Sequence, residues 1–204
     1  MKQLEPWLSF GCNHDLQIIV IEPFFEEANR CRRLVAEIMR RLDLLSIGSC
    51  IADLPGTGES PVDIADVRLA DWRRAAKELA PPLVASFRGG ALIDDVASLG
   101  NWRFAPETGS RIVRDLKRTT LTNEDRTLYA GHPLSEDFLS ELELAMPLPC
   151  ANLRTVRLDT DAGDADVKFP GSPLWRRAEP GEDSALASAL AADLANWARL
   201  CVKF

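Results

Sequence analysis

The stretch PLVASFRGGA, residues 82–91, decides the fold. Its first six residues are apolar or small and too few for a helix, which predicts a strand buried on both faces of a sheet. Two glycines follow at Gly89 and Gly90, and a helical stretch is expected at 91–99. The sequence therefore predicts a sharp strand-to-helix turn with Arg88 at its tip.

Two strand–helix pairs precede this turn. Residues 16–21 and 47–54 are short apolar runs that predict buried strands, and residues 26–42 and 65–79 carry apolar side chains at helical spacing. The alternation predicts an α/β fold with a doubly wound, mostly parallel sheet. The second half is less regular: we expect strands at 102–105, 128–131 and 153–158, helices at 109–119, 134–145 and 184–202, and a loop at 159–182.

Composition limits the class of protein. The chain has 204 residues, 46% hydrophobic and 27% charged, which is typical of one globular domain spanning residues 1–204. The net charge of -7 argues against nucleic-acid binding. No basic leader and no apolar run of about 20 residues occurs, so we expect a cytoplasmic protein without a membrane span. The five cysteines are widely spaced, and we expect no metal or cofactor.

Ligands of doubly wound sheets bind at the carboxyl ends of the strands. The segment DLPGTGES, residues 53–60, follows the second predicted strand and is of a kind common in α/β hydrolases. No G-x-x-G or Gly-Lys-Ser continuation supports a nucleotide loop. We expect Asp53 and Ser60 to tie this loop together rather than to catalyse.

The turn at Arg88 departs from the pattern of a serine hydrolase. That fold carries G-x-S-x-G there, and alignment gives Arg88 the position of the nucleophile and Ser86 that of the first glycine. Arginine stays protonated and cannot attack a carbonyl, and Ser86 is expected to point into the packing. Neither His14 nor His132 stands late enough in the chain to serve as the base. Nucleophile and base are both predicted to be absent.

One segment resembles a known family. EPFFEEANRCRR, residues 22–33, together with DLPG at 53–56, is similar to the exosortase A system-associated hydrolases, whose turn also carries arginine in G-L-R-x-G. Glu22 and Glu59 depart from that family's pattern, which has proline and aspartate there. Residues 130–135 and 170–175 also look related. The resemblance implies an α/β-hydrolase fold, in proteins found with bacterial exopolysaccharide and protein-sorting systems. The chain is short for that fold, so we expect a reduced lid.

Arg88 is the centre of the candidate site. We expect a salt bridge to Glu26, with Glu27 and Glu179 as alternative carboxylates, because a buried charge requires a partner. The sharper hypothesis is a pocket in which Arg88 binds an anionic group. The ligand-binding residues predicted on this basis are Phe24, Phe25, Glu26, Glu27, Arg88, Gly89, Trp175 and Glu179.

Three functions remain open at this point. The chain is a binding or accessory protein of exopolysaccharide or protein-sorting systems, an unusual hydrolase in which Glu26 or Glu27 is the general base, or an interaction module. The partner is a small molecule or a protein, and a homodimer stays open. The basic residues of the helix at 109–119 are expected to form a solvated face.

Overall fold

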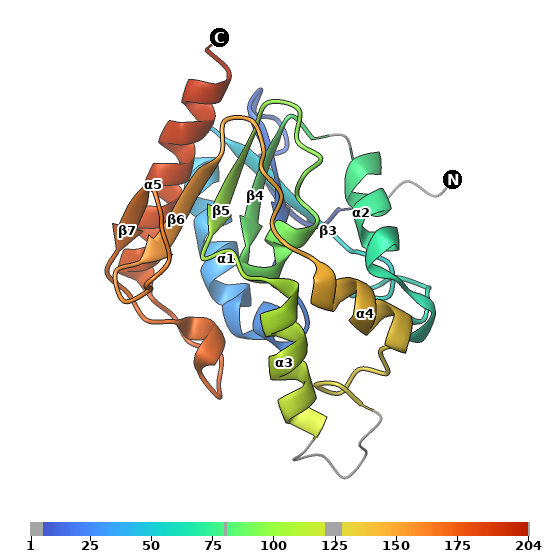
Figure 1. Ribbon diagram of the computed structural model, residues 1–204. Coiled ribbons are helices and arrows are strands. Elements are labelled where there is room, and N and C mark those ends of the chain that lie inside the picture. Colours follow the sequence, from blue (N-terminus) through green and yellow to red (C-terminus); the bar gives the residue numbers. More distant parts are fainter. Residues whose placement is uncertain (1–5, 80, 121–127, 204) are drawn as a thin grey trace.

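The computed structural model describes residues 6–79, 81–120 and 128–203. Its centre is a seven-stranded sheet (Figure 1). The order of the strands is β1 (Pro6–Phe10), β3 (Gly48–Ala52), β2 (Gln17–Ile21), β4 (Leu83–Phe87), β5 (Gly100–Phe104), β6 (Arg154–Leu158) and β7 (Val167–Phe169). Only the pairing of β1 with β3 is antiparallel in this sheet of described residues. The predicted doubly wound, mostly parallel sheet is confirmed.

Helices cover both faces of the sheet. On one face α1 (Glu26–Leu44) packs against α5 (Ser184–Cys201), and on the other α2 (Leu69–Glu78) and α3 (Gly109–Thr120) pack with α4 (Glu136–Leu144). The strands divide their side chains between the two faces, because successive residues of a strand point in opposite directions. In β4, Leu83, Ala85 and Phe87 belong to the first core and Val84 to the second.

The long helix α1 shows why the sequence folds this way. One face of it is apolar and buried, formed by Cys31, Leu34, Val35, Ile38, Met39 and Leu42. Glu26 and Glu27 occupy its first turn, where carboxylates interact favourably with the helix dipole. Phe25 precedes the helix at φ 56°, a conformation that is uncommon outside glycine. The loop from β2 into α1 therefore bends sharply at the carboxyl end of the sheet.

Three expectations about elements were wrong. Residues 91–99 form no α-helix, because the short 3₁₀ helix η2 (Arg88–Leu92) ends and the chain turns. Residues 91–94 are all buried, so this stretch lacks the solvent-exposed side of an amphipathic helix. Residues 128–131 contribute only a bridge between Tyr129 and His132. The strand β1 was not predicted, and β7 lies within the expected loop at 159–182. Both are short strands at the edges of the sheet, and so few residues leave a weak signal in the sequence.

The segment between β5 and β6 holds α3 and α4, which lie toward the end of the sheet where the arrowheads of β4 and β5 point (Figure 1). No helix in the described part of the chain is both long enough and apolar enough for a membrane crossing. The same residues contain no cluster of three His, Cys, Asp or Glu side chains suited to a metal ion.

Candidate functional site

The turn after β4 is tight because three segments meet there. Arg88 has φ 53°, in the left-handed region. A Cβ on Gly89 would lie 2.8 Å from the Phe24 ring, and one on Gly90 would lie 2.7 Å from the carbonyl oxygen of Ile21. Both glycines are therefore required by the close approach of β2 and its loop. This turn takes the place of the one that presents the nucleophile in α/β hydrolases, but a short 3₁₀ helix, η2, follows it here instead of an α-helix.

The guanidinium of Arg88 is held from several sides. Its Nε and Nη2 each donate to one carboxylate oxygen of Glu27, both at 3.1 Å, and Nη1 donates to the carbonyl oxygen of Ala105 at 3.1 Å. Nη2 also lies 3.4 Å from Glu107 Oε2. The residue is only 7% exposed. Arg88 is thus a buried cation with its charge neutralised by two carboxylates.

The expected salt bridge to Glu26 was wrong, because Glu27 is the partner. Glu26 instead accepts a hydrogen bond of 2.6 Å from Arg30, one turn further along α1. Neighbouring side chains on a helix point about 100° apart, so only one of the two glutamates faces the turn. Sequence alone could not tell which of them this would be.

The loop after β7 covers the guanidinium with an indole ring. Trp175, in the short helix η3 (Leu174–Arg176), places its ring centroid 4.5 Å from the guanidinium carbon of Arg88, a cation–π contact. Arg30 donates to the carbonyl oxygen of Trp175 at 3.0 Å and holds the loop against α1. This is the loop in which the hydrolase pattern calls for the histidine. In this chain its tryptophan lies on the residue at the nucleophile position.

A cavity of about 350 Å³ opens beside Arg88. Six of the predicted residues line it: Phe24, Phe25, Glu26, Glu27, Arg88 and Trp175. Gly89 packs under Phe24 and does not line it, and Glu179 is exposed in the loop beyond η3. Sequence reasoning missed the other lining residues, among them Glu107 and Arg176. For these two, the only signals in the sequence are that Glu107 comes shortly after β5 and that Arg176 follows Trp175.

The other candidate residues lie away from Arg88 or have side chains that stabilise the surrounding structure. Ser86 is fully buried and donates to Asp94 at 2.7 Å, so its side chain points into the packing as predicted. His14 is 2.8 Å from Asp43 in the turn before β2, at the opposite end of the sheet. His132 packs against the Phe25 ring, and burial lowers the pKa of its imidazole. Within the described residues, no histidine contacts the turn at Arg88.

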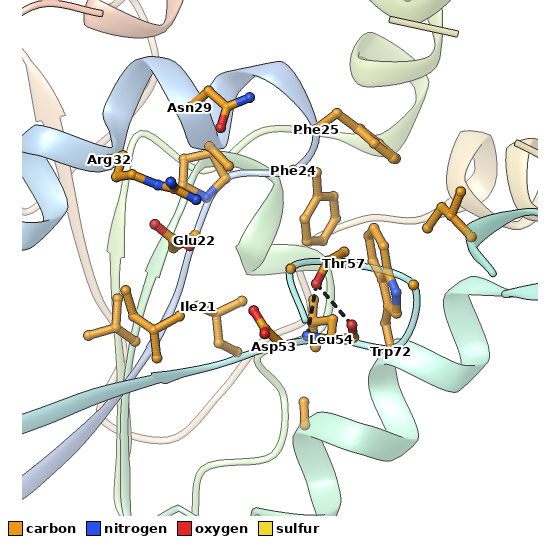
Figure 2. Close-up of a pocket in the computed structure, with 18 of the residues that line it drawn as sticks. Ile21, Glu22, Phe24, Phe25, Asn29, Arg32, Asp53, Leu54, Thr57 and Trp72 are labelled. Carbon is orange, nitrogen blue, oxygen red and sulfur yellow. Dashed lines mark hydrogen bonds between the residues drawn. The ribbon is translucent and has the colours of Figure 1, made fainter. Parts of the chain in front are cut away.

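The loop after β3 is tied together by its own side chains, as the sequence predicted. Asp53 accepts a hydrogen bond of 2.9 Å from the backbone N–H of Glu59, and Ser60 Oγ accepts one of 3.0 Å from the N–H of Gly56. This loop forms one wall of a second cavity, of about 480 Å³, which lies beyond Phe24 and Phe25 at the ends of β2 and β3 (Figure 2). Glu22, the first residue after β2, also lines it.

Burial raises the pKa of Glu22 from 4.5 to about 7, Arg32 opposes the shift, and Asp53 adds to it. The folded protein therefore holds this proton more tightly than the unfolded chain between pH 4.5 and 7, and the stability it contributes is lost as the pH rises through 7.

Glu22→Gln is expected to raise the free energy of unfolding by about 1–2 kcal/mol at pH 8.5, because the buried charge is removed, and to change it little at pH 4. Urea denaturation at the two pH values measures this. An equal effect at both would contradict the assignment.

The strand order, the antiparallel first strand and the tight turn at Arg88 together define the α/β-hydrolase fold, which this chain has. It is similar to Est1E from Butyrivibrio proteoclasticus, solved with ferulic acid bound, at 13% identity over 94% of this chain and 93% of that one, with a TM-score of 0.61. A thermophilic esterase from Thermogutta terrifontis is similar at 11% identity, over 95% and 92%, with a TM-score of 0.62.

Alpha/beta hydrolase domain-containing protein 10 from mouse is similar at 14% identity over 88% of this chain and 89% of that one, with a TM-score of 0.59. At these identities the likeness concerns the fold. No protein-family model and no curated protein matches the sequence.

Proposed function

We propose that this chain is a non-hydrolytic α/β-hydrolase-fold protein that binds a small anionic ligand in the cavity beside Arg88. The observation that carries the proposal is the position of Arg88 and the contacts of its side chain. It stands where the fold presents a nucleophile, and its side chain is fixed by Glu27 and lies under Trp175. A hydroxyl nucleophile with a histidine base, as acyl transfer by this fold requires, has no counterpart among the described residues at this turn.

The charges of the cavity favour an anionic group. Five arginines and four carboxylates line it, and each carboxylate is within ion-pair distance of an arginine. Arg176 is the one lining arginine whose side chain has no ion pair in the described part of the chain. It can therefore offer its donors to a phosphate or carboxylate. The rings of Phe24 and Phe25 supply an apolar wall for the rest of the ligand.

The resemblance of residues 22–33 to the exosortase A system-associated hydrolases suggests where such a ligand arises. We infer an accessory role in a bacterial exopolysaccharide or protein-sorting system, in the cytoplasm. The ligand class is then an anionic glycan or a lipid phosphate. The mixed polar and apolar lining suits a lipid phosphate better, because the tail has aromatic side chains to contact.

The alternative of carboxylate-based hydrolysis has less support. A general base must take a proton from the attacking water, and pairing with a cation makes a carboxylate a weaker base. Glu27 is paired with Arg88 through both of its oxygens, and Glu26 is paired with Arg30. A pure interaction module would not need an open cavity at the turn, and about 350 Å³ is open there.

We expect p-nitrophenyl acetate and p-nitrophenyl butyrate to be hydrolysed at the uncatalysed rate by the wild-type protein, and equally by Glu26→Gln and Glu27→Gln. The physical reason is the lack of an available nucleophile or base at the turn. Release of the p-nitrophenolate ion, followed by its visible absorbance, measures this. Turnover that disappears in either variant while the protein stays folded would establish the hydrolase alternative.

Binding is tested with geranyl phosphate and its uncharged analogue geraniol by isothermal titration calorimetry. Geranyl phosphate is expected to bind at least about tenfold more tightly, and Arg176→Ala is expected to remove most of that difference by deleting a charge-assisted hydrogen bond. Arg177→Ala is the matched control, since Arg177 is an exposed neighbour that does not line the cavity. Equal affinities for the two compounds, or equal losses in the two variants, would refute the proposal.

A further inference from the structure

The second cavity, beyond Phe24 and Phe25, is larger than the one at Arg88 and plays no part in the proposed function. It lies at the carboxyl ends of β2 and β3, where doubly wound sheets bind ligands. Its volume of about 480 Å³ is sufficient for a small organic molecule. Phe24 and Phe25 form a common wall of the two cavities. All the other lining residues differ between the two.

Two carboxylates form one side of this cavity because of the strand register. Val20 of β2 lies opposite Ile51 of β3. Glu22 and Asp53 each follow two residues later, as the first residues after the two strands. The parallel pairing therefore brings the two acidic side chains to the same edge. Figure 2 shows both at the cavity, with Arg32 of α1 next to Glu22.

Aromatic rings form the opposite side. Phe24 and Trp72 are in contact, with ring centroids 4.8 Å apart, and Phe25 lies 5.8 Å from Trp72. Trp72 is held in place by a hydrogen bond of 2.8 Å from its Nε1 to the carbonyl oxygen of Pro55. The faces of such rings carry partial negative charge and attract cations. The rings therefore supply both an apolar surface and a favourable electrostatic one.

The charged residues that line the cavity are unbalanced. Three carboxylates, of Glu22, Asp53 and Glu59, stand against the one guanidinium of Arg32. Burial raises the pKa of Glu22, and the nearby carboxylate of Asp53 raises it further. A cationic group brought into the cavity would stabilise the ionised form of Glu22 and relieve its repulsion with Asp53.

We propose that this cavity binds an organic ammonium ion, with the cation against Glu22 and Asp53 and the apolar part of the molecule against Phe24, Phe25 and Trp72. The site is formed by the register of β2 and β3 together with the loop that contains Asp53. It takes amines of the size of a substituted phenylethylamine. Apart from the shared side chains of Phe24 and Phe25, none of the residues that line it lines the cavity beside Arg88.

The test uses 2-phenylethylamine, with the neutral 2-phenylethanol and the anionic 3-phenylpropanoate for comparison, titrated calorimetrically into the full-length protein at pH 8.5. The amine is expected to bind at least about tenfold more tightly than the alcohol, because only the amine gains the charged contacts. Equal affinity for amine and alcohol would overturn the proposal.

Glu22→Gln is expected to weaken binding of the amine about tenfold while leaving the alcohol unchanged. Asp53→Asn, which keeps an oxygen to accept from the N–H of Glu59, is expected to act in the same direction. Glu78→Gln is the matched control, because Glu78 is exposed on α2 and does not line the cavity. A loss in the control equal to that in Glu22→Gln, or no loss in either cavity variant, would refute the site.

The pH dependence provides a readout that a structural role for Glu22 would not produce. Arg32, Asp53, Glu59 and His132 are the other charged or titratable side chains at the cavity. Because the pKa of Glu22 is about 7, affinity for the amine should rise about fourfold from pH 6.5 to 8.5. The rise should vanish in Glu22→Gln. A rise that persists in this variant would assign the titration to another group, such as His132, and overturn the role of Glu22.

Binding of geranyl phosphate should be the same in Glu22→Gln as in the wild-type protein, since Glu22 does not line the cavity at Arg88. Failure of one site thus leaves the other testable.

Discussion

Asp94→Ala is expected to lower the free energy of unfolding by about 3–5 kcal/mol, the cost of leaving one partner of a buried ion pair alone. Asp94 is completely buried, and its two carboxylate oxygens accept hydrogen bonds of 2.7 and 2.8 Å from Arg103. It also accepts from Ser86 at 2.7 Å. Removing the carboxylate leaves a guanidinium that is only 3% exposed without its counter-charge.

Urea denaturation followed by tryptophan fluorescence measures this effect. Asp95→Ala is the matched control, because the neighbouring aspartate is exposed and should cost no more than about 0.5 kcal/mol. Asp94→Asn should fall between the two, since it keeps an acceptor but loses the charge. A loss below about 1 kcal/mol for Asp94→Ala would mean that the pair contributes little to the fold.

The second large effect is expected at the turn itself. Arg88→Leu should lower the free energy of unfolding by about 2–3 kcal/mol, because Glu27 and Glu107 lose the cation that neutralises them in a largely buried place. Leucine keeps a side chain at the positive φ of residue 88, so the backbone cost is similar in both proteins. The change in stability then reports mainly on the ion pairs.

A double-mutant cycle isolates the pair with Glu27. Glu27→Gln in the Arg88→Leu background should cost much less than in the wild-type protein, because the unpaired carboxylate is no longer present. Arg118→Leu is the control, since its side chain is 70% exposed and its pair with Asp115 is at the surface. Additive effects of Arg88→Leu and Glu27→Gln would contradict a direct interaction between them.

These two ion pairs hold the turn and its surroundings in shape. Arg88 connects α1 through Glu27, the end of β5 through the Ala105 carbonyl, and η3 through the ring of Trp175. The pair of Asp94 and Arg103 ties the chain after η2 to β5. The cavity beside Arg88 is therefore framed by segments from both halves of the chain, held together by buried charges.

The residues of the turn were predictable because local chemistry decides them. An apolar run followed by two glycines specifies a strand and a sharp turn, and Gly89 and Gly90 are needed wherever backbones approach closely. The same holds for the loop at 53–60, whose Asp53 and Ser60 bond to backbone groups a few residues away. Interactions within a few residues leave a pattern in the sequence.

The partners of Arg88 were not predictable in this way. Glu27, Glu107 and Trp175 lie 61, 19 and 87 residues from it, and each reaches it from a different element. Choosing Glu27 over Glu26 depends on the rotation of α1 about its axis, which the packing of its buried face sets. The end of η2 at Leu92 likewise depends on Asp94 meeting Arg103 of a neighbouring strand.

The sequence by itself determined the alternating strands and helices, the tight turn and the arginine at its tip. Only the tertiary structure decided what that arginine does: it placed Glu27 and Trp175 on Arg88 and brought Glu22 next to Asp53. The physical reason is that periodicity and turn chemistry act between near neighbours in the chain. Charge pairing and cavity shape depend on the register of strands and the rotation of helices, which are settled only when the whole core packs.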